Sequence, residues 1–168
     1  MQLVDAHCHF DFQAFECRRI EFWQRARQAG VSRLVIPVVR QRDWSRVQAL
    51  ASESNDWWYC LGIHPGFVGE HGDKALDDLE SALRNADDRC VGLGECGLDR
   101  LHGDLGAQMP WFEAQVELAD SLGLPLVIHS VRTHDEVAAV LRRARTAGDV
   151  GASRLAFDEA CPSSRIPT

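Results

Sequence analysis

Short apolar runs alternate five times with longer amphipathic segments along this chain, and no other feature constrains its fold as much. Each run is too short for a confident helix, and most are rich in Val, Ile or Leu, as in a parallel strand covered on both faces. The runs are Leu3–Ala6, Arg33–Val39, Trp57–Ile63, Cys90–Gly94 and Leu124–Ile128. The segments between them are predicted to be helices, at approximately 16–29, 43–54, 73–87, 108–122 and 133–145. The pattern predicts an α/β protein with a parallel sheet, either doubly wound or closed into a barrel.

Composition limits the partners that such a chain can have. The 168 residues include 18 Lys and Arg against 25 Asp and Glu, which gives a formal net charge of -7. Proteins that grip duplex nucleic acid along its backbone usually present a basic face. We therefore expect any nucleic-acid contact to be local and concentrated near metal ions.

Neither disulfides nor a membrane contact is expected. The six cysteines form no CxxC pair and no secretory signal precedes them, so we expect buried, free thiols. No apolar stretch approaches the ~20 residues that span a bilayer. These features predict a cytoplasmic protein.

Five side chains that can bind metals fall at the ends of successive predicted strands. The first strand runs into His7 and His9, the third into His64, the fourth into Glu95 and the fifth into His129. In a β/α barrel the active site lies at the carboxyl ends of the strands. A nucleotide-binding open sheet would instead carry a Gly-rich turn after its first strand. That position reads His-Cys-His-Phe, so a TIM-type β/α barrel is favoured.

Each of these residues also has an ordinary structural explanation. Side chains at positions i and i+2 of a strand point to the same side, so His7 and His9 can reach one ion together, or they can simply be hydrogen-bonded. Glu95 ends an apolar strand, where a pair of divalent ions or an Arg would compensate its charge. His129 ends a buried strand and needs a partner, which can be a metal, a carboxylate or the backbone. The combination favours a metal site.

Several neighbouring residues have two readings each. His64, in Gly-Ile-His-Pro, is expected either to contact substrate and support the ligands or to be structural. Asp99 can orient a ligand or cap the next turn. Arg132 can meet an anionic group of a substrate or lie solvated in a loop. We assign the adjacent Trp57 and Trp58 to packing, with one facing the barrel and the other the helices.

Four sequence blocks resemble the successive signature motifs of the TatD family. They are Asp-Ala-His7-Cys-His9-Phe, Gly-Ile-His64-Pro65, Gly94-Glu95-Cys96-Gly97-Leu98-Asp99 and Pro125-Leu-Val-Ile-His129-Ser130. Four blocks in this order make the resemblance specific, and it covers roughly residues 1 to 145. The first motif and the Arg132-Thr133-His134-Asp135 run look similar to the less characterised YjjV-like branch. TatD proteins are metal-dependent hydrolases with a TIM barrel, and several act as deoxyribonucleases.

The resemblance implies a site for two divalent ions. By position, His7 and His9 bind one ion, Glu95 bridges both, and His129 binds the second. Glu95 and His64 are the expected catalytic residues, while His64 and Arg132 are the expected substrate contacts. The ions would be Mg²⁺, Mn²⁺ or Zn²⁺, since histidine-rich ligation favours the last two and the family is often considered Mg²⁺-dependent. Two further ligands of the family, a histidine before a Phe-Ser-Gly turn and an aspartate near the last strand, are not found in this sequence.

The length of the recognisable pattern falls short of a whole barrel. A β/α barrel typically needs ~250 residues, and this pattern supplies about five of the eight βα units. We expect a truncated chain, in which residues 1–145 form a partial barrel and residues 146–168 form a tail of non-family sequence. The first and fifth strands would then have exposed edges, through which copies of the chain can associate.

The predicted reaction is phosphodiester hydrolysis by a two-metal site, with DNA or a small phosphoester as substrate. One alternative is amidohydrolase-like cleavage of C–N or ester bonds, although that class would favour a carbamylated lysine in place of Glu95. Another alternative is a non-catalytic fragment that retains some metal binding.

Overall fold

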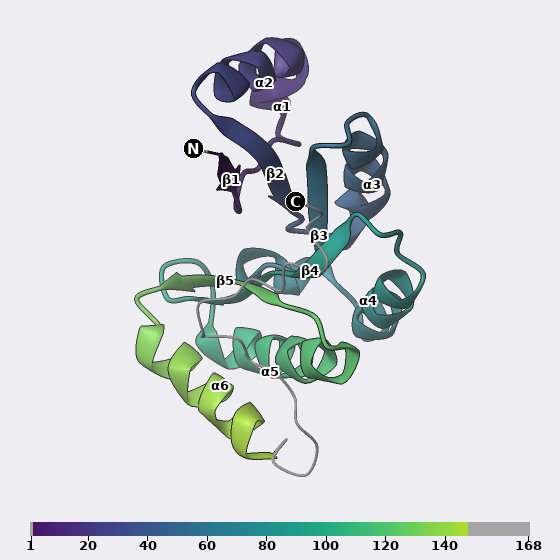
Figure 1. Cartoon of the computed structure of the whole chain (residues 1–168). Helices are drawn as coiled ribbons and strands as arrows, with labels where there is room; N and C mark the ends of the chain where they lie inside the picture. The colour runs from purple at the N-terminus through teal and green to yellow at the C-terminus, as the bar shows by residue number, and fades with distance from the viewer. Residues whose placement is uncertain (1, 148–168) are drawn as a thin grey trace.

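The computed structural model describes residues 2–147, which form five parallel strands alternating with helices (Figure 1). The strands are β1 (Leu3–Asp5), β2 (Val31–Pro37), β3 (Trp57–Leu61), β4 (Cys90–Asp99) and β5 (Leu126–Val131). The α-helices are α1 (Gln13–Glu16), α2 (Arg19–Gln28), α3 (Trp44–Ser52), α4 (Ala75–Arg84), α5 (Leu105–Leu122) and α6 (His134–Ala147). Two short 3-10 helices complete the set, η1 (Gln41–Asp43) and η2 (Pro65–Glu70).

The strands lie in the sheet in the same order as in the sequence, β1-β2-β3-β4-β5, and every pairing is parallel. In a doubly wound sheet the order of the strands reverses part-way along the sheet, and helices cover both faces. Because parallel crossovers are right-handed, a sheet with sequential order carries its helices on one face. Figure 1 shows α2 to α6 following the curve of the sheet on its outer side. This topology is that of a β/α barrel and confirms the predicted fold class, with five of the eight strands.

The two faces of β3 distinguish the outside of the barrel from its inside. Trp57 belongs to the large core between the sheet and the helices. Trp58 and Cys60 point the other way and pack with Val35 in a small second cluster. The prediction that one tryptophan faces the helices and the other the barrel is therefore confirmed.

Strand β4 runs five residues further than the sequence suggested, and this extension forms part of the site. The register between β4 and β5 shifts between Gly94 and Cys96, after which pairing resumes as far as Asp99. At Gly97 the backbone has a φ of 139°, and a Cβ there would lie only 2.0 Å from the carbonyl oxygen of His129. Only glycine permits this approach of the two strands.

Two buried glutamines of α5 hold the carboxyl ends of β3 and β4. The side-chain amide of Gln115 accepts from the Ile63 backbone N–H and donates to the Ile63 carbonyl, at 2.8 and 3.0 Å. Gln108 pairs with the backbone of Asp99 in the same way, at 2.7 and 3.0 Å, and also donates to the His102 carbonyl. These bonds fix the backbone beside the site to a rigid helix.

Several other expectations concern the ends and the surface of the fold. The predicted helix at 16–29 is divided into α1 and α2, and α6 extends two residues past the expected boundary at 145. The remainder of the predicted tail, residues 148–168, lies outside the described residues. Within residues 2–147, the five cysteines are free and no helix is long and apolar enough to cross a membrane.

Candidate metal centre

The carboxyl end of β4 places one oxygen of Glu95 against the two histidines that follow β1. Glu95 Oε2 lies 3.3 Å from His7 Nε2 and 3.2 Å from His9 Nε2, and the two nitrogens are 3.4 Å apart. Tetrahedral ligands that lie ~2.1 Å from a zinc ion are about 3.4 Å from one another. The three atoms therefore have the mutual spacing of ligands to a single ion.

The bonding of Glu95 also fits a divalent cation. The residue is buried, and within the described residues its Oε2 atom has no hydrogen-bond partner despite the two imidazoles that face it. A buried carboxylate oxygen without a partner is costly. An ion held jointly with His7 and His9 would satisfy this atom.

The other oxygen of Glu95 belongs to a second group. Glu95 Oε1 lies 2.9 Å from His129 Nδ1 and 3.9 Å from His64 Nε2, and one ligand atom from each of the three residues falls within 4.8 Å of the others. The two oxygens of one carboxylate thus face two different sets of histidines. This is the arrangement expected of a carboxylate that bridges two ions.

Asp99 orients His129 from the side opposite Glu95. Its Oδ2 atom lies 2.9 Å from His129 Nε2 and 2.9 Å from His102 Nδ1, and its Oδ1 atom accepts from the Leu101 N–H at 2.8 Å. Asp99 therefore contacts a candidate ligand and also caps the following turn, so the two sequence-based interpretations of this residue are compatible. Carboxylates in this position fix the orientation of a ligating imidazole.

The charge of the carboxylates is maintained by the surrounding imidazoles. Burial opposes ionisation of Glu95, but the hydrogen bond with His129 and the proximity of the His9 ring outweigh burial and hold the pKa of Glu95 well below the ordinary value. Burial of Asp99 is likewise outweighed by hydrogen bonds from His129 and His102, which lower its pKa. The proximity of the Glu95 carboxylate raises the pKa of His9 and of His129, against the effect of burial. Both carboxylates are consequently anionic near neutral pH, as cation binding requires.

His64 differs from the other histidines in the group that holds its ring. Its Nδ1 atom accepts a hydrogen bond of 3.0 Å from the Gly66 N–H at the start of η2. In the neutral ring the proton then resides on Nε2, the atom that faces Glu95, so this nitrogen is a donor. Burial, followed by the neighbouring His129, lowers the pKa of His64 to about 4. The geometry favours a neutral hydrogen-bond donor over a ligand.

Arg132 is the one expected site residue that lies outside the cluster. It follows β5 directly, is exposed, and has a backbone φ of 55°. Its carbonyl accepts from Arg100 Nε at 3.0 Å, whereas its guanidinium has no ion-pair partner among the described residues. The side chain is therefore at the same rim as His129 and available to a ligand.

One contact of the site carried no signal in the sequence. The ring of Phe12 stacks on that of His9, with centroids 4.7 Å apart and planes 16° apart. The pairing depends on the turn that follows β1, which periodicity does not predict.

Comparison with known proteins identifies relatives of this chain. The sequence matches the family described as TatD related DNase over residues 4–153. The uncharacterized metal-dependent hydrolase YjjV of Escherichia coli (strain K12) is 39% identical over 145 residues, which make up 84% of this chain and 56% of that protein. A protein of Pantoea ananatis named 3'-5' ssDNA/RNA exonuclease TatD is 32% identical over 131 residues, or 76% of this chain and 49% of that protein.

Solved structures show the same fold. The crystal structure of the E. coli protein matches with a TM-score of 0.80, over 84% of this chain and 56% of that one. A TatD family hydrolase from Entamoeba histolytica, 18% identical, matches with a TM-score of 0.77 over 88% and 56% of the two chains. The chain thus spans about half the length of these relatives, and its described part is an incomplete TIM-type barrel. It belongs to the TatD family of metal-dependent hydrolases.

Proposed function

We propose that this chain carries the metal-binding part of a hydrolase that cleaves phosphodiester bonds in nucleic acid with two divalent ions. The observation that supports the proposal most directly is the division of Glu95, whose two oxygens face two separate groups of histidines. The relative in P. ananatis is named a ssDNA/RNA exonuclease, which favours a nucleic acid over other phosphoesters. A carboxylate at position 95 does not favour the amidohydrolase alternative.

The residues would divide the ligation between them. His7, His9 and Glu95 hold one ion, while Glu95 and His129 hold the other, with His129 oriented by Asp99. Mg²⁺, Mn²⁺ or Zn²⁺ in these positions would activate water and offset the charge that develops on phosphoryl oxygens.

Two further residues are suited to bind the substrate. His64 presents an Nε2–H toward Glu95, so it can donate to an oxygen of a phosphate bound beside that carboxylate. Arg132 presents a guanidinium at the end of β5, and arginine pairs with phosphate in a bidentate manner. We assign both to substrate binding, and His64 and Glu95 to the catalytic group.

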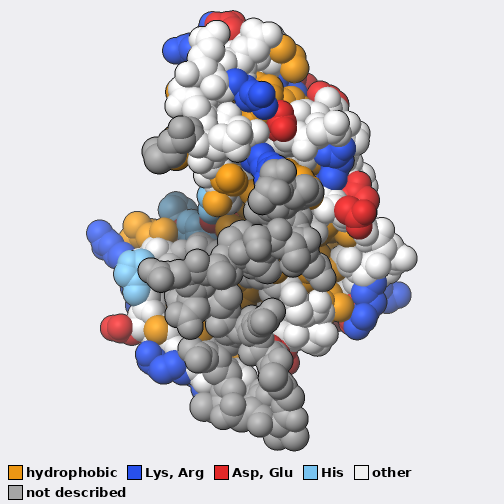
Figure 2. Space-filling model, viewed as in Figure 1, with side chains coloured by type: hydrophobic (Ala, Val, Ile, Leu, Met, Phe, Trp, Pro, Cys, Tyr) orange, Lys and Arg blue, Asp and Glu red, His pale blue; other side chains and the backbone are white. Residues whose placement is uncertain are grey.

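The charge distribution fits a substrate that is held locally. On the face shown in Figure 2, acidic and basic side chains of the described residues are interspersed. The whole chain has a formal net charge of -7. A protein that binds long duplexes through many phosphates usually presents a continuous basic surface. A short or single-stranded substrate, held near the ions, agrees better with this charge.

The exposed edge of the sheet supports self-association as a secondary proposal. Among the described residues β1 pairs only with β2, and its Leu3 and Val4 side chains are exposed. Unprotected edges of this kind pair readily with other chains. Analytical ultracentrifugation of the wild type and of Val4→Lys tests this: the variant should be more monomeric, and an unchanged distribution would exclude the edge.

The proposed activity is tested by measuring metal stoichiometry and hydrolysis in the same preparation. We expect two ions per chain, and Mn²⁺-dependent release of nucleotides from single-stranded DNA. His7→Ala should lower both, while Ile20→Ala, an exposed apolar residue on α2, should change neither. Metal binding without hydrolysis of DNA or of a small phosphodiester would contradict the proposal and support the non-catalytic alternative.

A further inference from the structure

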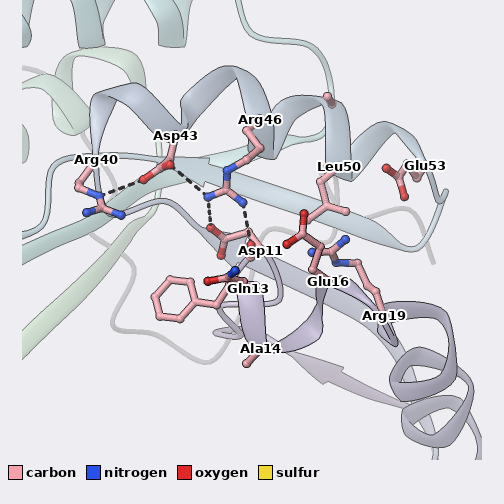
Figure 3. A pocket seen from close by; sticks show the side chains of 12 residues that line it. Asp11, Gln13, Ala14, Glu16, Arg19, Arg40, Asp43, Arg46, Leu50 and Glu53 are labelled. Carbon is pink, nitrogen blue, oxygen red and sulfur yellow. Dashed lines mark hydrogen bonds and ion pairs between the residues drawn. The ribbon is translucent and has the colours of Figure 1, made fainter.

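A cleft with a volume of about 720 Å³ opens beside the metal centre, between α1 and α3 (Figure 3). One wall is formed by residues 11–14, Glu16 and Arg19. The other wall is formed by Arg40 and by residues of η1 and α3. The volume lies within the range of pockets that hold small organic ligands.

Each wall of the cleft is linked to the candidate metal centre through one aromatic ring. On one wall the Phe12 ring stacks on His9, a candidate ligand. On the other wall the Arg40 guanidinium lies 4.6 Å from the ring centroid of Phe67, and that ring is 5.7 Å from His64. A molecule bound in the cleft would therefore be separated from His9 by the Phe12 ring and from His64 by the Phe67 ring.

Two groups in the walls have unused capacity for recognition. Phe12 is 45% exposed, so the ring face that does not meet His9 remains open. Arg40 uses its Nε atom on Asp43 at 3.0 Å, and its two terminal nitrogens make no hydrogen bond within residues 2–147. These are an aromatic surface and a cation.

Arg46 fixes this arrangement from the side of α3. It donates to the Asp11 carbonyl and to Asp11 Oδ2 at 2.7 and 2.8 Å, and it also pairs with Asp43 at 3.2 Å (Figure 3). The segment that carries Phe12 is thereby tied to the helix that Arg40 precedes. The aromatic surface is held in place before any ligand arrives.

The charges along the cleft indicate how a ligand would lie in it. Arg40 lies at one end of the row of α3 side chains and Glu53 at the other, with Glu16 opposite (Figure 3). The far end has mixed charge, because Arg19 lies there with the two carboxylates, whereas Arg40 would attract phosphate at the end where its guanidinium lies on Phe67. The cleft thus fits a ligand that is anionic at one end and neutral and planar in its body.

We propose that the cleft binds the nucleotide adjoining the phosphate at the metal centre, with its base stacked on Phe12 and its phosphate paired with Arg40. Stacking of the base on one aromatic ring, with a guanidinium at the phosphate, makes this site tolerant of sequence and selective for unpaired strands. The proposal rests on the proposed function, whose substrate it specifies as single-stranded nucleic acid.

Binding of fluorescein-labelled short DNA strands, followed by anisotropy in the presence of a chelator, tests the cleft without hydrolysis. A set of strands each lacks the base at one position. We expect one abasic position to weaken wild-type binding by about tenfold, the usual value of one stacked base. Phe12→Ala should weaken binding of the intact strand by the same factor and abolish the abasic penalty. Phe12→Trp should restore both, and Ile20→Ala should match the wild type.

The outcomes separate this proposal from the proposed function. The proposal that the cleft binds a base is contradicted if the abasic penalty persists in Phe12→Ala, or if Phe12→Ala and the wild type bind the intact strand equally. It is also contradicted if the wild type binds no strand. Nucleotide release with Mn²⁺ is measured on the same proteins. If Phe12→Ala hydrolyses DNA as fast as the wild type, the proposed role of the cleft is wrong but the proposed activity stands. If binding depends on Phe12 but no DNA is hydrolysed, the cleft binds DNA and the proposed activity is wrong. Circular dichroism confirms that the exposed substitutions leave the fold intact.

Discussion

The two candidate ligand groups of the proposed metal centre differ in how firmly the fold holds them. Near the middle of the sheet, Glu95 and Asp99 are buried, and His129 has a carboxylate at each ring nitrogen. At the edge, His7 and His9 follow the three-residue strand β1, and their side chains are 41% and 28% exposed. No carboxylate other than Glu95 lies at a ring nitrogen of this pair in the described structure.

This difference implies unequal affinities for the two ions. An imidazole that is already oriented loses little conformational freedom when it binds a metal, while an exposed one must be ordered first. We therefore expect the group of Glu95 and His129 to bind its ion more tightly than the group of His7 and His9. The following changes test the contrast, beginning with the largest effect.

Glu95→Gln should abolish the contrast by removing the residue common to both groups. We expect the affinity for both ions and the rate of hydrolysis to fall. Substituting a residue that only hydrogen-bonds to a metal ligand lowers affinity or activity roughly 10–100-fold, and the loss in Glu95→Gln should be larger. Calorimetric titration with Mn²⁺ measures the binding. Glu113→Gln, an exposed carboxylate on α5, is the matched control and should retain both ions. If Glu95→Gln retained one ion at full affinity, Glu95 would not be a shared ligand.

Gly97→Ala should disrupt the central group through the backbone. A Cβ at this position would meet the His129 carbonyl, and the φ of 139° is unfavourable for alanine. We expect the free energy of unfolding to fall by roughly 3 kcal/mol or more, as measured by urea denaturation. Gly72→Ala meets no atom within 4 Å and should change stability by less than about 0.5 kcal/mol. Equal stability of the two variants would show that β4 and β5 can separate freely at this point.

Asp99→Asn should weaken only the central group. The amide oxygen can still accept from the Leu101 N–H, but the charge beside His129 Nε2 is lost. We expect one ion to bind about 10–100-fold more weakly and the other to be unaffected, with the opposite pattern in His7→Ala. Equal weakening of both ions in either variant would contradict the separation of the two groups.

Thiol reactivity should show the same contrast with the smallest effect. Burial raises the pKa of Cys60 and Cys96, and it raises that of the half-buried Cys8 to about 11, whereas Cys17 is exposed. A higher pKa leaves less thiolate at a given pH, so alkylation at mildly alkaline pH should modify Cys17 first, Cys8 more slowly, and the central pair only on unfolding. Peptide mass mapping over time measures the order. Rapid modification of Cys96 would mean that local unfolding exposes β4 as readily as the edge strand β1.

The sequence was sufficient for the architecture because its signal is repetitive. Five apolar runs with amphipathic segments between them predict a parallel sheet, and the polar residues after four of these runs predict the functional rim. The extension of β4 could not be predicted, since it depends on the approach of Gly97 to His129 across two strands. Gln108 and Gln115 look like ordinary polar positions of a helix until their partners are known.

The same limit applies to the site. The residue types at 7, 9, 95 and 129 indicated a metal centre, because few other functions need them at strand ends. The role of Asp99 stayed open, as only the position of His129 distinguishes an orienting group from a turn cap. The cleft depends on contacts between α1 and α3, which lie far apart in the chain.

The backbone of Arg132 has a consequence for how this protein could change under selection. A left-handed conformation costs a residue with a Cβ about 1 kcal/mol, which glycine largely avoids. Arg132→Gly should therefore leave the fold equally or more stable while it weakens affinity for an anionic substrate. This trade-off between stability and binding is measurable as an equal or higher melting temperature together with weaker substrate affinity. It would show that the Arg132 side chain contributes to binding and not to stability.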